Sequence, residues 1–277
     1  MCSSDLMAAA CDVLDLDAYR ARIAYTGVLE PTRAVLDALH LAHASHIPFE
    51  NLDVLLGRPI RLDLDSLQAK LIRGGRGGYC FEHNLLFAAL LECAGFSVTR
   101  LAARVRYGTE RVLPRTHMLL NVSVDGGDWI ADVGFGIEGL LLPVAYKDGA
   151  EQEQYGRCYR AVPEGGEWTL QIREADRWAA LYTFSLAAQQ PVDYLPANHY
   201  TSTHPDSRFV QTLTVQQPTP EARKVLRNRE LAIDRGGAIT RRRIADDAAL
   251  LDVLEEVFDL RFPRGTRFPF RETPPGA

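Results

Sequence analysis

The sequence Arg73-Gly74-Gly75-Arg76-Gly77-Gly78-Tyr79-Cys80-Phe81-Glu82 decides how the N-terminal part of this chain folds. Apolar residues follow it at helical spacing, from Phe81 to about Ala94, and Gly95 ends the pattern. We therefore expect a helix that starts beside Cys80. Unpaired backbone N–H groups and the positive end of the helix dipole favour a thiolate there. The glycine-rich loop predicts a nucleophilic cysteine, although most free cysteines are only small buried hydrophobes.

Two downstream residues are of the types that would activate a nucleophilic cysteine. His117 begins one strand-like run and Asp132 lies near the end of the next, so a Cys–His–Asp relay with a base and an orienting carboxylate is expected. If Val124 pairs with Trp129 in the predicted hairpin, His117 lies too far along its strand to contact Asp132. A bulge, a different register or pairing through another strand would then be needed.

These motifs resemble those of the arylamine N-acetyltransferase family. Arg76 to Asn84 is similar to the family's nucleophile motif, and Asp132-Val133-Gly134-Phe135-Gly136 to its acid motif. His43 to Asp53 resembles the N-terminal signature, and Asn198 to Pro205, with Phe209, resembles the mid-chain signature. The order and spacing of the four blocks fit the family, and the set is far more specific than any single block.

The resemblance implies an α+β fold with a papain-like Cys-His-Asp triad. It comprises a helical bundle carrying the nucleophile (1–95), a β-barrel-like domain carrying the histidine and aspartate (96–206) and an α/β lid (207–277). The periodicity is compatible with that order, because helical patterns dominate before Gly95 and strand-like runs follow. In the last part we expect a strand from Phe209 to Val215 and a helix from Asp246 to Phe258.

The resemblance further implies an acyltransferase of xenobiotic metabolism. It would move an acetyl group from acetyl-coenzyme A to arylamines, hydrazines or arylhydroxylamines by a ping-pong mechanism through acetyl-Cys80. His117 would handle protons and Asp132 would orient the imidazole, with no metal involved. The implied contacts are Val105, Phe135 and Phe209 for the aromatic acceptor, and Thr116 and Gly136 for the coenzyme A arm.

Two positions depart from the family pattern and could alter substrate preference. His83 stands where the family usually carries another residue type, and Ile137 follows the acid motif where another small residue is frequent. Other functions share the triad chemistry: a hydrolase or transglutaminase-like enzyme that does not use coenzyme A, or a family-related amide synthase acting on a carrier-bound acyl chain. A catalytically silent binding protein is disfavoured, because all three triad residues are present.

Composition is that of an ordinary globular enzyme. The 277 residues carry a net charge of −5, which argues against nucleic acid as the main partner. There is no convincing signal peptide and no apolar run long enough to cross a membrane. Five scattered cysteines suggest no disulfide framework and a reducing, cytoplasmic location. They are Cys2, Cys11, Cys80, Cys93 and Cys158.

Two remaining patterns each allow a functional and a structural interpretation. His40, His43 and His46 recur every third residue, but the first and last share no helix face, so hydrogen bonding or packing is favoured over metal binding. The segment 221–243 contains eight Lys/Arg and three Asp/Glu. A solvated face explains most such runs, while contact with the phosphates of coenzyme A is the alternative.

Overall fold

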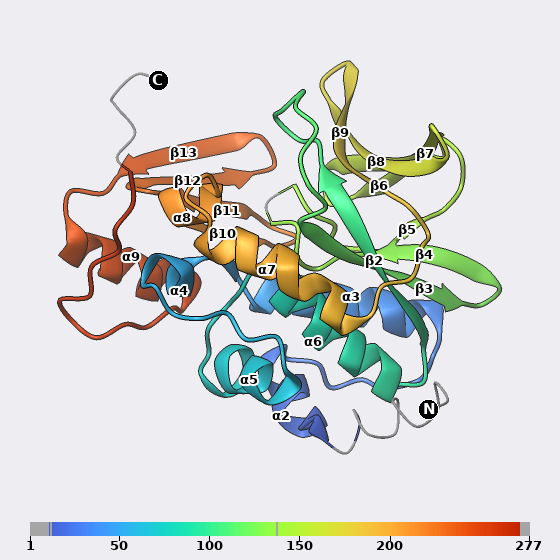
Figure 1. Cartoon of the computed structure of the whole chain (residues 1–277), viewed down its shortest axis with the longest axis horizontal. Coiled ribbons are helices and arrows are strands. Elements are labelled where there is room, and N and C mark those ends of the chain that lie inside the picture. The colour runs from blue at the N-terminus through green and yellow to red at the C-terminus, as the bar shows by residue number, and fades with distance from the viewer. Residues whose placement is uncertain (1–10, 12, 137, 272–277) are drawn as a thin grey trace.

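The computed structural model describes residues 11, 13–136 and 138–271. N-terminal helices, a large antiparallel sheet and a smaller sheet with its helix follow one another along the chain (Figure 1), which confirms the expected α+β class. Cys2 and Ile137 lie outside the described residues. The N-terminal elements are α2 (Leu16–Arg22), α3 (Arg33–His46), β1 (Phe49–Glu50), α4 (Leu52–Leu55), α5 (Leu64–Leu67), the π-helical segment η1 (Gln68–Arg73) and α6 (Cys80–Cys93).

Helix α6 is the centre of the N-terminal part. Every residue from Cys80 to Leu91 is buried, because the helix is apolar on nearly all sides and the other elements surround it. Glu82 accepts a hydrogen bond from the N–H of Tyr79 at 3.1 Å and so caps the first turn. Gly95 follows the helix with a φ of +87°, which confirms the predicted stop.

The large sheet forms a nearly closed barrel. Its eight strands are antiparallel in the order β5-β4-β3-β2-β9-β8-β7-β6. The two edge strands meet, since Ala145 N donates to Gln152 Oε1 at 3.1 Å. The strands are β2 (Ser97–Val105), β3 (His117–Val124), β4 (Gly127–Ala131), β5 (Val144–Ala145), β6 (Gln152–Gln154), β7 (Arg157–Glu164), β8 (Glu167–Glu174) and β9 (Arg177–Phe184).

The β3–β4 hairpin differs from the register considered for the sequence. Trp129 pairs with Val122, and Val124 pairs with Gly127. The hairpin is therefore closed by two residues, with Asp125 and Gly126 both at positive φ, as a tight type I′-like turn requires. Relative to the Val124–Trp129 pairing, this register moves β4 by two residues and brings its end toward the start of β3.

The smaller sheet combines one strand from the N-terminal part of the chain with four strands from the C-terminal part. Its order is β1-β10-β11-β12-β13, so the N-terminal strand β1 lies at the edge of the C-terminal sheet. The helix predicted from Asp246 to Phe258 is confirmed as α9, but the strand predicted from Phe209 to Val215 is wrong in its first half, where α8 lies. The remaining elements are the 3₁₀ helix η2 (Pro191–Asp193), α7 (Tyr194–Thr203), α8 (Arg208–Gln211), β10 (Thr214–Pro218), β11 (Arg223–Arg227), β12 (Glu230–Arg235), β13 (Ala238–Arg243) and α9 (Asp247–Phe258).

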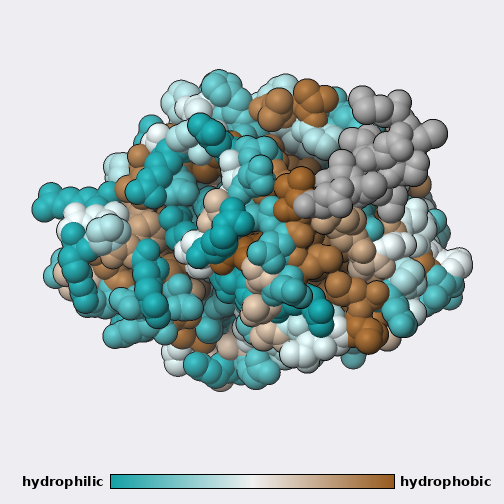
Figure 2. All heavy atoms as spheres, turned by 90° about the horizontal axis from the view of Figure 1, so that it is seen from below, coloured by the Kyte–Doolittle hydropathy of each residue, from teal (hydrophilic) through white to brown (hydrophobic). Residues whose placement is uncertain are grey.

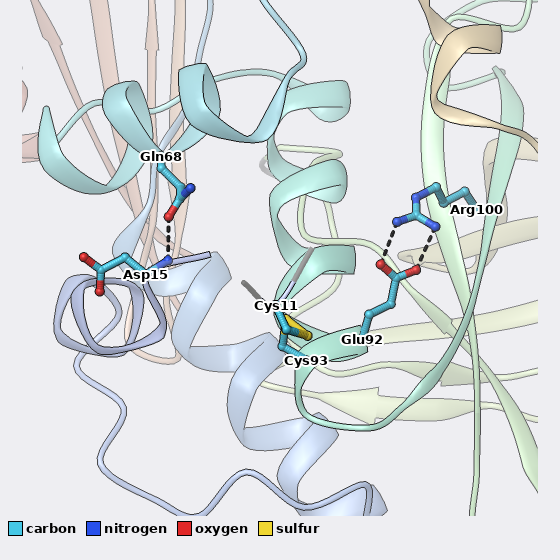
Figure 3. The surroundings of a disulfide bond; sticks show 6 residues. All are labelled: Cys11, Asp15, Gln68, Glu92, Cys93 and Arg100. Carbon is cyan, nitrogen blue, oxygen red and sulfur yellow. Dashed lines mark hydrogen bonds and ion pairs between the residues drawn. A yellow bond between two sulfur atoms is a disulfide. The ribbon is translucent and has the colours of Figure 1, made fainter. Parts of the chain in front are cut away.

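A disulfide joins Cys11 to Cys93 at the end of α6 (Figure 3). The prediction that the chain has no disulfide is therefore wrong for this pair. The two residues are 82 positions apart, so only the packing of the N-terminal segment on α6 brings them together. Beside the disulfide, Glu92 forms an ion pair with Arg100 at 2.8 Å, which ties the same helix end to β2. Cys80 and Cys158 are buried and free.

One face of the molecule carries a mixed surface that is polar over a large part. Figure 2 shows the face turned downward in Figure 1, where hydrophilic residues cover most of the left half and apolar residues gather toward the right. Of the helices among the described residues, none is long and apolar enough to span a membrane.

Candidate active site

The loop before α6 can hold Cys80 in place only because it contains glycine. A Cβ on Gly77 would overlap the carbonyl oxygen of Pro48, and a Cβ on Gly78 would lie 2.6 Å from Glu82 Oε2. Gly78 also pairs with β1: the backbone N–H of Glu50 donates to the carbonyl oxygen of Gly78 at 2.7 Å. The glycines therefore permit close packing of the loop against its neighbours, which fixes the position of the cysteine that follows.

Buried charges brace the same loop. Arg76 forms ion pairs with Glu50 at 2.6 Å and with Asp53 at 3.2 Å, and Lys70 pairs with Glu82 at 2.7 Å. Burial alone would lower the pKa of Lys70, but Glu82, Glu50 and Asp53 outweigh it and raise that pKa. The sequence analysis did not identify this cluster. Its only sequence signal was charged residues inside otherwise buried, apolar stretches.

His117 and Asp132 meet where β3 begins and β4 ends. His117 Nε2 lies 2.7 Å from Asp132 Oδ2, and both side chains are almost fully buried. The observed hairpin register explains the contact: Leu120 pairs with Ala131, so Asp132, one residue further, is diagonal to His117. The thiol of Cys80 lies 3.6 Å from the carbonyl oxygen of Thr116, directly before His117. The fold thus brings the three predicted triad residues into one cluster.

The electrostatics favour an ion pair between His117 and Asp132. Burial by itself would lower the pKa of His117, but the charge and hydrogen bond of Asp132, together with the Cys80 side chain, raise it to about 10. Burial would likewise raise the pKa of Asp132, but His117 and the hydrogen bonds it accepts keep that pKa below its usual value. The imidazole is therefore held as an imidazolium beside a carboxylate at neutral pH.

Three further groups hold Asp132 in position. Its Oδ1 accepts from Asn84 Nδ2 at 3.0 Å and from Gly134 N at 2.9 Å. Its own N–H donates to His40 Nε2 at 3.1 Å. A Cβ on Gly134 would lie 2.8 Å from the Cα of Cys80, so the chain after Asp132 packs directly on the nucleophile's backbone. The sequence alone does not indicate that Asn84 and His40 bond to Asp132, although both lie in the quoted motifs or beside them.

The predicted hydrogen-bonding role of the α3 histidines is confirmed for His40 and His43. His40 Nδ1 lies 3.1 Å from Leu141 O, and both ring nitrogens of His43 have hydrogen-bond partners. His46 is exposed, and its ring nitrogen Nδ1 hydrogen-bonds to the carbonyl of Ala42 at 2.8 Å. Within the described ranges, no three His, Cys, Asp or Glu side chains are grouped to hold a metal ion.

A cavity of about 590 Å³ opens onto Cys80 and His117. Phe135 packs edge-on to His117 with 5.1 Å between ring centres, and Phe209 lies 5.9 Å from the rings of both Phe49 and Tyr79. The predicted contact residues Val105, Phe135, Phe209 and Thr116 all line the cavity. The sequence analysis missed its polar lining, which includes Tyr107, Glu138, Gln216, Arg208 and Arg227.

Gly136 does not line this cavity. It has a φ of +95°, and a Cβ there would overlap Gln216 Oε1, so glycine makes room for a side chain that does reach the cavity.

Asn51 and Asn198 hold the aromatic residues Phe209 and Tyr79 in place. Asn51 Nδ2 donates to Phe209 O at 2.6 Å, and Asn198 accepts a hydrogen bond from the Tyr79 hydroxyl.

Comparisons with known proteins agree with this geometry. A family model described as N-acetyltransferase matches residues 32–266. The arylamine N-acetyltransferase of Mycobacterium tuberculosis H37Rv is 42% identical over 253 residues, which is 89% of each chain. The solved M. tuberculosis enzyme superposes with a TM-score of 0.86 at 41% identity, covering 89% of this chain and 94% of the other. The Mycobacterium marinum enzyme in complex with CoA gives a TM-score of 0.85 at 38% identity, covering 89% and 93%. The chain therefore belongs to the arylamine N-acetyltransferase family, enzymes that transfer an acetyl group from acetyl-coenzyme A to an arylamine.

Proposed function

We propose that Cys80, His117 and Asp132 perform the acetyl transfer of this enzyme by a ping-pong mechanism. The observation that carries the proposal is the 2.7 Å contact between the buried Asp132 and His117, which lines the same cavity as Cys80. The Cys80 thiolate attacks the thioester carbonyl of acetyl-coenzyme A. Unpaired N–H groups in the first turn of α6 stabilise the oxyanion. The carbon–sulfur bond of the thioester breaks, and the coenzyme A thiolate leaves with the proton that His117 donates.

In the second half-reaction His117 accepts a proton instead of donating one, and Cys80 is the leaving group instead of the nucleophile. The nitrogen of an arylamine, hydrazine or arylhydroxylamine attacks the carbonyl of acetyl-Cys80. Neutral His117 accepts the proton that the nitrogen loses, and the bond to the Cys80 sulfur breaks to regenerate the thiolate. Asp132 holds the imidazole in position and stabilises the imidazolium that re-forms.

The cavity lining supports an assignment of the substrate contacts. We propose that Val105, Phe135 and Phe209 bind the aromatic ring of the acceptor, because these apolar side chains surround the opening to Cys80. Thr116 contacts the coenzyme A arm from beside His117. Gly136 acts indirectly, by leaving room for Gln216 in the same wall.

We propose that Arg208 and Arg227 bind the phosphates of coenzyme A at the mouth of the cavity. Both line it, and neither forms an ion pair with a described residue; the ring of Phe209, 5.7 Å from the Arg208 guanidinium, is an uncharged contact. The pKa of Arg208 is lowered by burial and by the nearby positive charge of Arg227. Two neighbouring cations on one cavity lining favour an anion that binds to both. Arg227 also lies in the basic segment 221–243.

A thioester without phosphates tests this assignment. Substituting Arg208 or Arg227 with alanine should raise the KM for acetyl-coenzyme A severalfold, while the reaction with acetyl-N-acetylcysteamine should stay unchanged. Equal losses with both donors would place the arginines elsewhere in the mechanism.

Intact mass spectrometry tests the function as a whole. Mixing the protein with acetyl-coenzyme A should add about 42 Da at Cys80, and an arylamine should remove that mass. Loss of the mass in water alone would indicate a hydrolase. No gain of mass would contradict the proposed mechanism.

We also propose the regions 1–95, 96–206 and 207–277 as domains and a cytoplasmic location. Three apolar clusters, around α6, inside the barrel and beneath α9, support the domain division; the first also includes residues of β3 and β4, and the third includes Leu52 and Leu55. The Cys11–Cys93 disulfide weighs against a reducing compartment. Alkylation of thiols before cell lysis, followed by peptide mapping, would show whether this pair is oxidised in the cell.

A further inference from the structure

A continuous chain of hydrogen bonds crosses the helical core next to the nucleophile. The Tyr19 hydroxyl lies 2.6 Å from His43 Nδ1, and His43 Nε2 lies 2.9 Å from His83 Nδ1. His83 Nε2 in turn lies 3.2 Å from the carbonyl oxygen of Pro48. Tyr19, His43 and His83 have no exposed surface. The chain thus connects α2, α3, α6 and the segment before β1.

The Pro48 carbonyl oxygen at the end of this series fixes which atom donates and which accepts in each of its hydrogen bonds. A carbonyl oxygen only accepts, so His83 Nε2 carries a proton and donates to Pro48. In a neutral ring the other nitrogen of His83 then accepts, so His43 Nε2 donates and His43 Nδ1 accepts from Tyr19. Each ring must therefore donate one hydrogen bond and accept another. A protonated ring has two donors and cannot take part in this order.

The chain ends at the contact that supports the nucleophile loop. The Pro48 carbonyl also accepts from Gly78 N at 3.4 Å, two residues before Cys80, and leaves no space for a side chain on Gly77. The ring of Phe49, which lines the active-site cavity, lies nearly parallel to that of His83 at 6.4 Å. His83 therefore touches both the backbone that places Cys80 and an aromatic wall of the cavity.

The surroundings keep both histidines neutral. Burial lowers the pKa of His83 to about 4, although Pro48 and the charge of Glu50 act in the opposite direction and Lys70 adds to the lowering. Burial lowers the pKa of His43 well below its usual value, and the nearby His83, His40, Arg22 and His46 lower it further. Among the described residues, neither ring has a hydrogen bond to a carboxylate, unlike His117.

We propose that His43 and His83 are positioning residues for the acetyl transfer: as a neutral, directionally ordered pair they hold the Pro48–Gly78 contact that places Cys80, and protonation of the pair disrupts it. This inference rests on the proposed role of Cys80 as the nucleophile. It gives a function to His83, which lies within the sequence motif that carries Cys80.

Two substitutions at position 83 separate hydrogen bonding from mere space filling. In His83→Gln the amide oxygen can accept from His43 and the NH₂ group can donate to Pro48, whereas His83→Leu offers neither group. The matched control is His46→Gln on α3, the helix that carries His43, because among the described residues the His46 ring hydrogen-bonds to the Ala42 carbonyl of its own helix and not to His43 or His83. Single-turnover acetylation of Cys80 would be followed by intact mass, with circular dichroism to confirm folding.

We expect His83→Leu to slow Cys80 acetylation by about 10- to 100-fold, the effect typical of a small misplacement of a reacting group. We expect His83→Gln to retain more than about a third of the wild-type rate, with the KM for acetyl-coenzyme A unchanged. A folded His83→Leu protein that acetylates at the wild-type rate would overturn the proposal. So would a His83→Gln variant as slow as the leucine variant.

The pH dependence tests the proposal even if His83→Leu fails to fold. The wild-type acetylation rate should fall as the pH drops through about 4, where His83 becomes protonated. In His83→Gln the decline of the rate with pH should be less steep by about one proton. An identical acid limb in both proteins would contradict the role of His83 protonation. If wild-type protein forms no acetyl-Cys80 at all, the proposed function itself fails; if it does and the variants behave alike, only the positioning role fails.

Discussion

His117 at the edge of the barrel and the pair His43–His83 in the helical core are equally buried but carry opposite charge states. The pKa of His117 is raised to about 10, whereas that of His83 is lowered to about 4 and that of His43 is lowered well below its usual value. Burial lowers the pKa in all three cases, because it disfavours the charged ring. Burial alone therefore does not decide the charge state.

The hydrogen-bond partner accounts for the difference. His117 donates to the buried carboxylate of Asp132, which stabilises an imidazolium, while the His43–His83 pair ends on the neutral carbonyl of Pro48. The two regions suit different tasks. A group that exchanges protons with substrate needs a charge partner, and a group that holds a backbone segment needs a fixed order of donors and acceptors. Each prediction below tests one side of this contrast.

The largest effect is expected for Cys80→Ala. Turnover should fall below detection because no acetyl-enzyme can form, while the fold should persist because alanine fits the buried helix start. The pKa of His117 should also fall, since the Cys80 side chain contributes to raising it. Turnover, circular dichroism and an NMR titration of the imidazole should be measured together. Activity in a folded variant would refute the nucleophile assignment.

Asp132→Asn should be nearly as damaging. An amide cannot stabilise the imidazolium, and a comparable change in serine proteases costs ~10⁴-fold in rate. The same substitution should bring the pKa of His117 down toward those of His43 and His83 and so remove the contrast between the regions. Steady-state kinetics and the NMR titration test both points. A variant that keeps more than about a tenth of the wild-type rate would show that Asp132 is not the orienting acid.

Stability should fall in mild acid because of the neutral histidines. His40 and His83 have folded pKa values of about 4, and the folded pKa of His43 is also well below its usual value, against about 6.5 in the unfolded chain. Between these values the unfolded state binds more protons, so the free energy of unfolding decreases as the pH falls below about 6.5. Each such histidine contributes a slope of about 1.4 kcal/mol per pH unit. Urea unfolding at pH 6.5 to 5 measures the slope; a flat profile would show that these rings are already protonated in the folded protein.

The smallest effect concerns selective labelling. Brief iodoacetamide treatment at about pH 6 should modify Cys80 before Cys158, because Cys80 contacts an imidazolium whereas burial raises the pKa of Cys158. Cys11 and Cys93 should not react while their disulfide is intact. Prior acetylation should protect Cys80, and His117→Ala should abolish its preference. Peptide mapping that finds equal labelling of Cys80 and Cys158 would contradict the activation of this thiol.

Much of the site could be predicted from short segments of sequence. The glycine loop, the helix that starts at Cys80 and its end at Gly95 follow from local periodicity and backbone preferences. The strand-like runs around His117 and Asp132 were also recognisable. Their register was not, because a two-residue and a four-residue turn both satisfy the alternation of apolar side chains, and the packing of the barrel selects between them.

The sequence by itself determined the order of elements, the nucleophile at a helix start and the types of residue that the chemistry needs. Tertiary structure alone decided which of these residues meet: Cys11 with Cys93, Asp132 with Asn84 and His40, and His43 with His83. It also decided the charge state of each buried histidine. The physical reason is that periodicity and turn preference act over a few neighbouring residues, whereas a pKa or a hydrogen-bond direction depends on groups that only folding brings within a few ångströms.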